Sequence, residues 1–411
     1  MRRFANLYLI LFLADGGFSL MDELVPLLTP LEHFSALRNL LAVMVILMSV
    51  PVYISLGIDR RLPKRVFLPL IIFVFWTIIS TGLFPALAEF RMYGLLLSAA
   101  QVAIGMLPLT RFRKEGERCL TMPPELFTAP FYSLRNTLVF GAANLVVVPL
   151  VLVLLVFTVA NAYMSEYTAG FMRLAPGGLT MTERVYTRAN RTIRLNAMIH
   201  VGGREYYDAV ADSVTPGRII VLAEGVTDDE NLLRNRIDYG KVAGFLGLTS
   251  QKKLLFRGRL IEEEEFESPA TSSGKDQVRP GPVDILRADV DVSAFHPPTL
   301  LLLDALGKNL RESPSFVEGV LALNSWAEKN ITPEMNTIIM DDILHRRNLT
   351  VIGHLDQALE RYDTVIIPWG ALHMKEIEED VLRRGFVLQK ERERVSIDFR
   401  RLLMGMLIEP S

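Results

Sequence analysis

The chain has 411 residues, half of them hydrophobic, with 44 Lys and Arg residues against 46 Asp and Glu residues. This length accommodates two or three domains. The formal charge of −2 offers no strongly basic character, so we expect no nucleic-acid partner. The single cysteine, Cys119, excludes an intramolecular disulfide framework and a zinc cluster built from cysteines.

Long apolar stretches dominate the chain before residue 162. A bilayer core of about 30 Å takes roughly 20 helical residues to cross. A first stretch over residues 7–28 contains Asp15, Asp22 and Glu23, whose burial in lipid is costly. Four further stretches have the required length without such carboxylates: 40–58, 66–84, 92–109 and 138–160. We predict an α-helical transmembrane bundle of four or five helices over residues 1–164, with the lipid bilayer as its partner.

The first stretch has several possible structures. We expect a spanning helix, and the alternatives are a re-entrant segment or a signal-like start after Arg2 and Arg3. Its carboxylates fit a helix whose acidic side faces water or the bundle interior. An ion or proton path would need partner charges in the middle of the other stretches, and the sequence shows none there, so no transporter is predicted.

The charges of the connecting loops predict an orientation. Basic residues gather at 60–65 and 111–118, whereas the loop at 85–91 has only Arg91. The positive-inside rule places both basic loops and the N-terminus in the cytoplasm. With five spans, the chain after the last one is extracytoplasmic, and a different count of spans after residue 110 would reverse this.

The rest of the chain has the composition of an ordinary folded domain. Residues 165–183 are predicted to form a linker, and 184–411 a domain in which strands and helices alternate, which is typical of an α/β (mixed α+β) fold. Strands are expected at 192–200, 218–225, 364–368 and 386–396. A long helical stretch is expected at 229–247. The acidic and Pro-rich segment 261–282 is predicted to be a flexible loop.

Three side chains end apolar, strand-like runs. His200 and His373 each close such a run and precede a helical pattern, and Glu224 follows the run 219–223. In α/β folds, strand ends commonly direct ligands or bases into one cleft. Two imidazoles and a carboxylate are a usual ligand set for a divalent metal with an open position for water. Such a metal lowers the pKa of its water toward about 7 and so makes a nucleophile. The alternative is that each histidine is structural.

Other candidates are less distinctive. Arg347 and Asn348 follow a helical stretch, where they either cap the helix or hold a substrate carboxylate or an oxyanion. Glu205 lies in the first turn of the helix after His200, where it is either an ordinary N-terminal carboxylate or a ligand or base. Asp289 and Asp291 are interpreted as turn or cap residues, and the alternative is that they touch the site. Three histidines are interpreted as structural or surface groups: His296, His345 and His354.

Together these segments resemble the TraB/TIKI superfamily, which is related to the ChaN-like and erythromycin-esterase-like proteins. The resemblance rests on the strand ending at His200, the segment around Glu224, the pair Arg347–Asn348 and the segment 370–373 with the helix after it. It covers about residues 184–400. One position departs from the family pattern, because Ala197 stands where the first of two Gly-x-x-His motifs has glycine.

The resemblance implies a membrane-tethered, metal-dependent hydrolase, a peptidase acting on a peptide or protein substrate through a metal-bound water. His200, His373 and Glu224 would bind a divalent ion (manganese, cobalt or zinc). Glu224, Arg347, Asn348 and Glu205 would be the catalytic or substrate-positioning groups. Two alternatives stay open: a regulatory membrane protein that binds a signal peptide or haem without turnover, and a metal-free esterase with His200 as general base.

Overall fold

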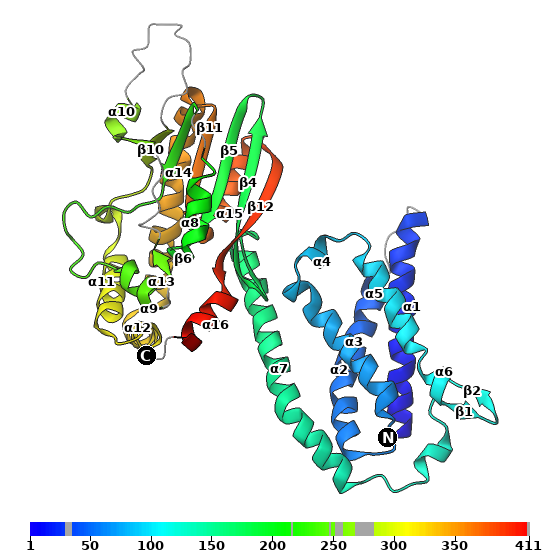
Figure 1. The fold of residues 1–411 in the computed structure, drawn as a ribbon. Coiled ribbons are helices and arrows are strands. Elements are labelled where there is room, and N and C mark those ends of the chain that lie inside the picture. Colours follow the sequence, from blue (N-terminus) through cyan, green and yellow to red (C-terminus); the bar gives the residue numbers. More distant parts are fainter. Residues whose placement is uncertain (29–34, 215–216, 246–247, 251–257, 268–282, 409–411) are drawn as a thin grey trace. The chain divides into compact units, whose positions relative to one another are not determined.

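The computed structural model describes residues 1–28, 35–214, 217–245, 248–250, 258–267 and 283–408, which form two compact units (Figure 1). The first unit is Met1–Ala162 and the second is Tyr163–Ser411. Helix α7 (Leu134–Tyr167) contains the boundary. The boundary therefore lies at residue 162, whereas the sequence predicted residue 164.

The first unit is helical. Among the described residues, five helices are long and apolar enough to cross a membrane. Four of them are α1 (Arg2–Leu28), α2 (Ser35–Ile58), α3 (Lys64–Leu83) and α7 (Leu134–Tyr167), and the fifth consists of α5 (Tyr93–Gly105) extended by α6 (Pro108–Arg111). The connections hold α4 (Ala86–Glu89), β1 (Arg113–Lys114), β2 (Glu117–Arg118) and η1 (Pro124–Phe127). A membrane protein with helical spans is thus confirmed, and the acidic first stretch forms a full-length helix.

Helix α1 packs closely against α2 and α5. A Cβ atom on Gly16 would lie only 3.0 Å from Cγ of Gln101, so glycine at this position lets the two helices approach. Small residues at helix contacts are typical of membrane bundles, where lipid gives no hydrophobic drive for association. Asp22 on α1 pairs with Arg38 on α2 at 2.6 Å. This partner charge near one end of α2 was not expected from the sequence.

Helix α7 differs from the other four. Its most apolar 18-residue window has no residue buried within the structure. Leu145 and Val146 are 79% and 71% exposed, respectively. Such a surface is compatible with lipid on most sides of the helix.

The second unit is built on an eight-stranded sheet, counted over the described residues. The order is β12-β4-β5-β11-β7-β10-β9, and β3 pairs with β4 as an additional strand. The five strands from β5 to β9 in this order run parallel, whereas β4 is antiparallel to its neighbours. The strands are β3 (Met172–Ala175), β4 (Gly178–Arg188), β5 (Arg191–Met198), β7 (Ile219–Ala223), β9 (Gly258–Ile261), β10 (Val283–Arg287), β11 (Thr364–Gly370) and β12 (Val387–Asp398). The predicted mixed α/β fold is confirmed at this level.

The central strands consist of continuous apolar runs. Ile220, Val221 and Leu222 of β7 are fully buried, as are Val365 and Ile367 of β11. Runs of this kind are typical of parallel strands that are covered on both faces, because neither face can be polar.

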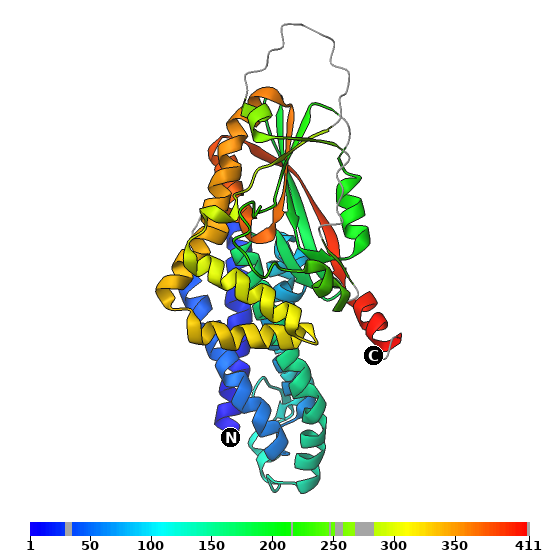
Figure 2. The same ribbon diagram turned by 90° about the vertical axis from the view of Figure 1, so that its left-hand side faces the viewer.

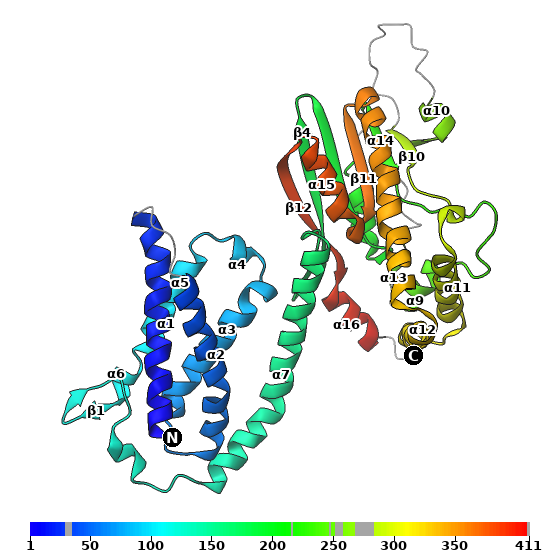
Figure 3. The ribbon, with the colours of Figure 1, turned by 180° about the vertical axis from the view of Figure 1, so that it is seen from behind.

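Helices cover both faces of this sheet. Helix α14 (Arg347–Arg361) and α8 (Arg204–Ala211) lie on opposite sides, as the edge-on view shows (Figure 2). Helix α15 (Met374–Arg383) lies beside α14 on the same face (Figure 3). Each helix packs through one apolar stripe, such as Met374, Ile377 and Val381 of α15, all fully buried. Gly385, with a φ of 79°, ends the last turn of α15 in the left-handed conformation that is typical of a glycine C-cap.

A helical subdomain follows strands β7 and β10 and lies beyond the carboxyl end of the sheet (Figure 1). It contains α9 (Tyr239–Phe245), α11 (Pro297–Glu312), α12 (Phe316–Asn330) and α13 (Pro333–Met340). Val201, Val242 and Leu310 form its small separate core. A Cβ atom on Gly307 would lie 1.9 Å from the carbonyl oxygen of Asn235, so glycine lets this loop rest against α11.

Three sequence-based expectations need correction. The predicted linker 165–183 instead forms the end of α7, strand β3 and the start of β4, because Gly177 and Gly178 turn the chain into a hairpin. Of the predicted helix 229–247, the described residues form only α9, and Asp228 instead caps an irregular loop through the amide of Leu232 at 2.7 Å. The predicted loop 261–282 begins with α10 (Glu263–Glu267), and 268–282 lie outside the described residues.

Candidate functional site

Four neighbouring parallel strands direct polar residues to one edge of the sheet. Glu224 follows β7 directly, Asp289 follows β10, His373 follows β11, and His200 follows β5. The order β5-β11-β7-β10 makes these strands adjacent. Their carboxyl ends are the usual binding edge of an open α/β sheet.

Arg347 is the centre of a buried polar cluster at this edge. Its Nε and Nη2 donate to the two carboxylate oxygens of Asp289 at 3.0 and 2.7 Å, and Nη2 also donates to Oε1 of Glu224 at 2.8 Å. Nη1 lies 3.2 Å from Nε2 of His373 and 3.5 Å from the carbonyl oxygen of Ile343. Each of the five guanidinium N–H groups therefore has an acceptor. Pairing with the two carboxylates raises the pKa of Arg347 despite its burial.

The helix that carries Arg347 is irregular just before it. A π-helical turn at Asp341–Arg346 joins α13 to α14. The fully buried Asp342 in this turn accepts from the backbone amide of His296 at 2.7 Å, at the start of α11. Such turns add a residue to the helix and are frequent at functional sites. Here the turn directs Asp342 toward the helical subdomain and Arg347 toward the sheet edge.

The two carboxylates of the cluster also bind backbone amides. Oε2 of Glu224 accepts from Gly370 at 2.7 Å, and Asp289 accepts from Gly225 and Val290 at 2.9 and 2.8 Å. The side chains of Glu224 and Asp289 are 4% and 0% exposed, respectively. Their charges are thus compensated locally by one guanidinium and by oriented amides.

His373 is held as a neutral imidazole. Its Nδ1 lies 2.7 Å from Oδ1 of Asn348, whose Nδ2 donates to Glu376 at 2.7 Å. This chain assigns the proton of His373 to Nδ1 and leaves Nε2 as an acceptor facing Arg347. Burial, followed by the positive charge of Arg347 and the effect of His200, lowers the pKa of His373 to about 3.

Trp369 packs beneath these groups. Its fully buried indole donates Nε1–H to the carbonyl oxygen of Leu222 at 2.9 Å. The ring meets His373 edge-on at 5.1 Å and lies 5.4 Å from the guanidinium carbon of Arg347. It thereby fixes both polar side chains against the strands.

His200 lies at the border of the cluster. Its side chain is exposed, and its ring contacts that of Tyr239 on α9 at 4.6 Å. Burial raises the pKa of Tyr239, with a further contribution from the charge of Glu224 and an opposing one from Arg347. Tyr239 therefore contacts the exposed imidazole and is influenced by the charges of the cluster.

The structure brings together most of the predicted site residues. His373, Glu224, Arg347 and Asn348 are linked by direct hydrogen bonds, and His373 and Glu224 also approach to 3.7 Å. Glu205 takes no part in this network: it is exposed on α8 and pairs with Arg401. The ordinary role of an N-terminal helix carboxylate accounts for Glu205.

Three contributors were not predicted from the sequence. Asp289 was interpreted as a turn residue, although like Glu224 it follows a short apolar strand, and this signal could have identified it. Glu376 and Tyr239 carried no sequence signal, because only the packing of α15 and α9 brings them to the site. Asp291, by contrast, caps the turn Val292–Ala294 as expected.

The residues present do not fit the predicted divalent metal in this arrangement. Both Glu224 and His373 already bind the guanidinium of Arg347, so an ion between them would lie against a fixed positive charge. Over the described residues, no three His, Cys, Asp or Glu side chains converge as a metal site. One feature is typical of a histidine that binds a metal: the Nδ1–H group of His373 is anchored by a hydrogen bond to Asn348.

The arrangement instead provides a rigid anionic edge. Glu224 and Asp289 contribute two negative charges, Arg347 one positive charge, and neutral His373 none, which leaves a net charge of −1 next to the exposed His200. A buried negative charge of this kind stabilises a neighbouring imidazolium. No family model, curated protein or solved structure matches the chain.

Proposed function

We propose that the second unit of this membrane protein is a hydrolase that cleaves an ester or amide carbonyl without a resident metal. One observation carries the proposal: the edge of the sheet that holds the fully paired Arg347–Glu224–Asp289 cluster also carries, after the neighbouring strand β5, the solvent-exposed imidazole of His200. The resemblance of these segments to the TraB/TIKI superfamily, with its esterase-like relatives, supports a hydrolase of this kind.

His200 is the general base of the proposed reaction. Its imidazole is exposed to solvent, whereas the lowered pKa of the buried His373 makes that imidazole a poor proton acceptor. His200 removes a proton from water, the hydroxide attacks the carbonyl carbon, and the imidazolium then returns the proton to the leaving group. The net negative charge of the cluster stabilises this imidazolium.

Arg347 acts as a positioning residue and not as a substrate-binding fork. All its N–H groups already have acceptors, so none is available for a substrate carboxylate. Its role is to fix Glu224, Asp289 and His373 relative to each other, which sets the charge that His200 experiences. Tyr239, whose ring contacts that of His200, offers a hydroxyl group for orienting the substrate.

A metal-dependent peptidase is the second candidate function. It is favoured by the neutral His373, whose Nδ1–H is anchored by Asn348 as in many metal ligands. This function would require Arg347 to release Nε2 of His373. A peptide or protein substrate is proposed for both candidates, as the resemblance implies.

The helices of the first unit support an extracytoplasmic position for the second. Asn6 near the N-terminus binds the backbone amide of Met122 at 2.7 Å, and Arg60 binds the carbonyl oxygen of Phe131. The N-terminus and both basic loops therefore share one end of the bundle, which the positive-inside rule assigns to the cytoplasm. Helix α7 starts at this end, so the chain after it emerges on the other side.

The test uses the full-length protein in lipid nanodiscs with p-nitrophenyl esters and a library of fluorogenic peptides as probes. The proposal predicts hydrolysis that survives a strong chelator, is lost in His200→Ala and persists in Glu205→Gln as a matched surface control. Loss of hydrolysis in chelator and its recovery with manganese, cobalt or zinc would favour the metal-dependent peptidase. Tight binding of a peptide or of haem without turnover would favour the non-enzymatic alternative.

A further inference from the structure

The membrane-spanning part of α7 is tied to α2 near its start. The side chains of Asn136 and Thr137 both donate to the carbonyl oxygen of Gly57 at 2.9 Å. Two turns further along α7, Asn144 accepts from the hydroxyl of Tyr53 on α2 at 2.8 Å. Hydrogen bonds of this kind meet no competition from water inside a bilayer, so they hold this end of α7 against α2.

The same helix is tied to α3 near the end of its apolar stretch. Asn161 donates to the carbonyl oxygen of Gly82 at 2.8 Å, and among the described residues it is the one buried residue of α7. A Cβ atom on Gly82 would lie 2.3 Å from Cγ2 of Thr158, so glycine at this position lets the two helices touch. Helix α7 is therefore held at two places.

The stretch between these two places stays open on the side that faces the bundle. Val147 and Val148 follow Asn144 by three and four residues, so they lie on the side of α7 that carries Asn144 and Thr158. They are nevertheless 40% and 44% exposed. Figures 1 and 3 show α7 apart from α2 and α3 over this stretch. Roughly 20 Å of helix, residues 145–157, thus contains no buried residue among those described.

The opposite side of this opening is apolar as well. Val50 precedes Tyr53 by one turn and Gly57 by two, so it lies on the side of α2 that binds α7. It is 61% exposed. Ile78, one turn before Gly82 on α3, is 40% exposed. We call Val50, Ile78, Val147 and Val148 together the open α7 face.

A proline accounts for the separation of α7 from its neighbours. Pro149 lies inside the helix, within the open stretch. Proline removes the hydrogen bond to the carbonyl group four residues earlier, and its ring bends the helix there. A helix that is held at two places and bent between them leaves space on one side.

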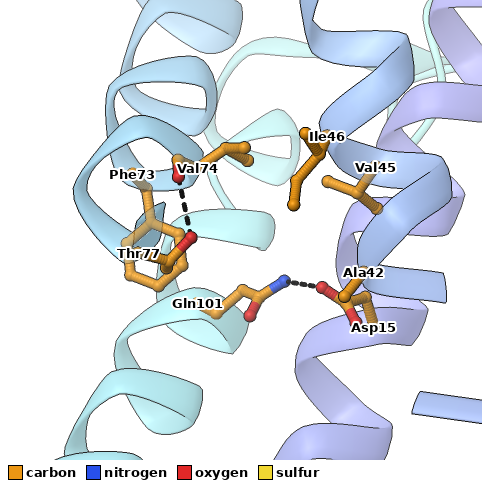
Figure 4. Close-up of a pocket in the computed structure, with 8 residues that line it drawn as sticks. All are labelled: Asp15, Ala42, Val45, Ile46, Phe73, Val74, Thr77 and Gln101. Atoms are coloured by element: carbon orange, nitrogen blue, oxygen red, sulfur yellow. Dashed lines mark hydrogen bonds between the residues drawn. The ribbon is translucent and has the colours of Figure 1, made fainter. Parts of the chain in front are cut away.

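The interior of the bundle offers a very different space. The cavity between α1, α2, α3 and α5 measures about 40 Å³, and Asp15, Thr77 and Gln101 give it polar groups (Figure 4). Such a volume suits water, which needs roughly 10–15 Å³ for its centre, and not a hydrocarbon chain. An apolar ligand of the first unit would therefore lie at the open α7 face.

We propose that an acyl chain of a bilayer phospholipid lies against the open α7 face and is retained there as a component of the first unit. The lining is hydrocarbon and lies within the spanning stretch, where the bilayer supplies acyl chains and almost no water. The contacts at both ends of the stretch confine the chain along α7. Val146, on the far side of α7, is 71% exposed, so lipid reaches this face by passing around the helix. The proposal does not depend on the hydrolase proposed for the second unit.

The first experiment measures lipid contact by fluorescence quenching in the full-length protein. Val148→Trp is made with Trp76, Trp326 and Trp369 replaced by phenylalanine, and the nanodiscs contain phosphatidylcholine with or without bromine on its acyl chains. Val146→Trp, on the opposite side of α7, is the matched lipid-facing control. A protein that keeps only the fully buried Trp369 is the reference without lipid contact.

We expect brominated lipid to quench Val148→Trp to the same extent as Val146→Trp. Quenching of Val148→Trp no greater than that of the Trp369 reference would overturn the proposal, because a protein segment and not lipid would then cover this face.

The second experiment tests retention by native mass spectrometry of the detergent-extracted full-length protein. We expect one phospholipid to remain on each chain, to be lost in Val50→Trp, whose ring fills the opening, and to remain in Val146→Trp. Ile78→Trp fills the same opening from α3 and serves if Val50→Trp loses its helical circular dichroism. No retained lipid in the parent, equal retention in the filled variants, or a dimer without lipid would each overturn the proposal.

Discussion

The two units treat buried carboxylates in opposite ways. In the second unit, Asp289 accepts four hydrogen bonds, two of them from Arg347, and Glu224 accepts from the same guanidinium. In the first unit, Asp15 has one neutral partner, Gln101, and an oxygen with no partner among the described residues. A cluster that carries its own cation can hold its neighbours in place, whereas Asp15 keeps a carboxylate oxygen unpaired among the described residues.

The largest effect is expected when the guanidinium of Arg347, the cation inside the cluster, is removed. Arg347→Ala leaves two buried carboxylates without their base, and we expect the free energy of unfolding of the second unit to fall by about 3–5 kcal/mol. The measurement is urea unfolding followed by Trp369 fluorescence, with Trp76 and Trp326 replaced by phenylalanine. Arg383→Ala removes a largely exposed guanidinium from Asp380, which keeps its pairing with Arg384, so this control should change little. A loss below about 1 kcal/mol for Arg347→Ala would contradict the role assigned to the guanidinium.

The pH dependence of stability tests whether the second unit holds His373 neutral. His373 has a pKa lowered to about 3 in the native state, against an ordinary value of 6.5. Between these values the unfolded chain binds the proton and the native chain does not, so stability is present above pH 6.5 and falls with acidification toward pH 3. The contribution is at most about 5 kcal/mol.

His373→Gln removes this titration. Its free energy of unfolding should be less dependent on pH than that of the parent between pH 6.5 and 4, in the same fluorescence assay. Parallel curves for the two proteins across this range would show that His373 is not held neutral.

Much of the edge of the sheet could be predicted from the sequence, because strand-end signals are local. Apolar runs followed by His200, Glu224 and His373 identified three strand ends, and strand adjacency then brings them together. The same signal precedes Asp289, but charged residues interrupt the apolar run of β10, so Asp289 was interpreted as a turn or cap residue. The cation that joins the carboxylates lies on α14, behind a π-helical turn that no sequence periodicity predicts.

In the first unit, the sequence predicted the helices but not the contacts between them. Span lengths were predictable because the hydrophobic thickness of a bilayer fixes them. The contacts of Asp15 were not, because they depend on how α1 packs on α5. The pairing of Asp22 with Arg38 and the approach of Gln101 to Gly16 are likewise products of helix packing.

A smaller effect is expected at the amide that fixes His373. Asn348→Ala removes the acceptor of the Nδ1–H group, and we expect a loss of about 1–3 kcal/mol in the free energy of unfolding. Asn348→Asp places a carboxylate at the same distance and should raise the pKa of His373. The acid-induced loss of stability should then be smaller and level off at a higher pH than in the parent, and an unchanged profile would argue against this hydrogen bond.

The smallest effect is expected at Glu205. Its carboxylate is exposed and paired only with Arg401 among its described ion-pair contacts. Glu205→Gln should leave both hydrolysis and unfolding unchanged within error, since exposed pairs contribute little. A large loss of hydrolysis with normal folding would restore Glu205 as a catalytic candidate.

The central claim is that Arg347, and not a metal ion, compensates the charges of the site. The most direct test measures the metal content of the full-length protein in nanodiscs by elemental mass spectrometry. Samples are first incubated with manganese, cobalt or zinc and then desalted, beside His200→Ala, His373→Ala and Glu224→Gln. With Arg347 occupying Glu224 and His373, we predict substoichiometric metal that does not differ between parent and variants. Near-stoichiometric metal in the parent, lost in both histidine variants, would contradict the account and establish a shared metal centre.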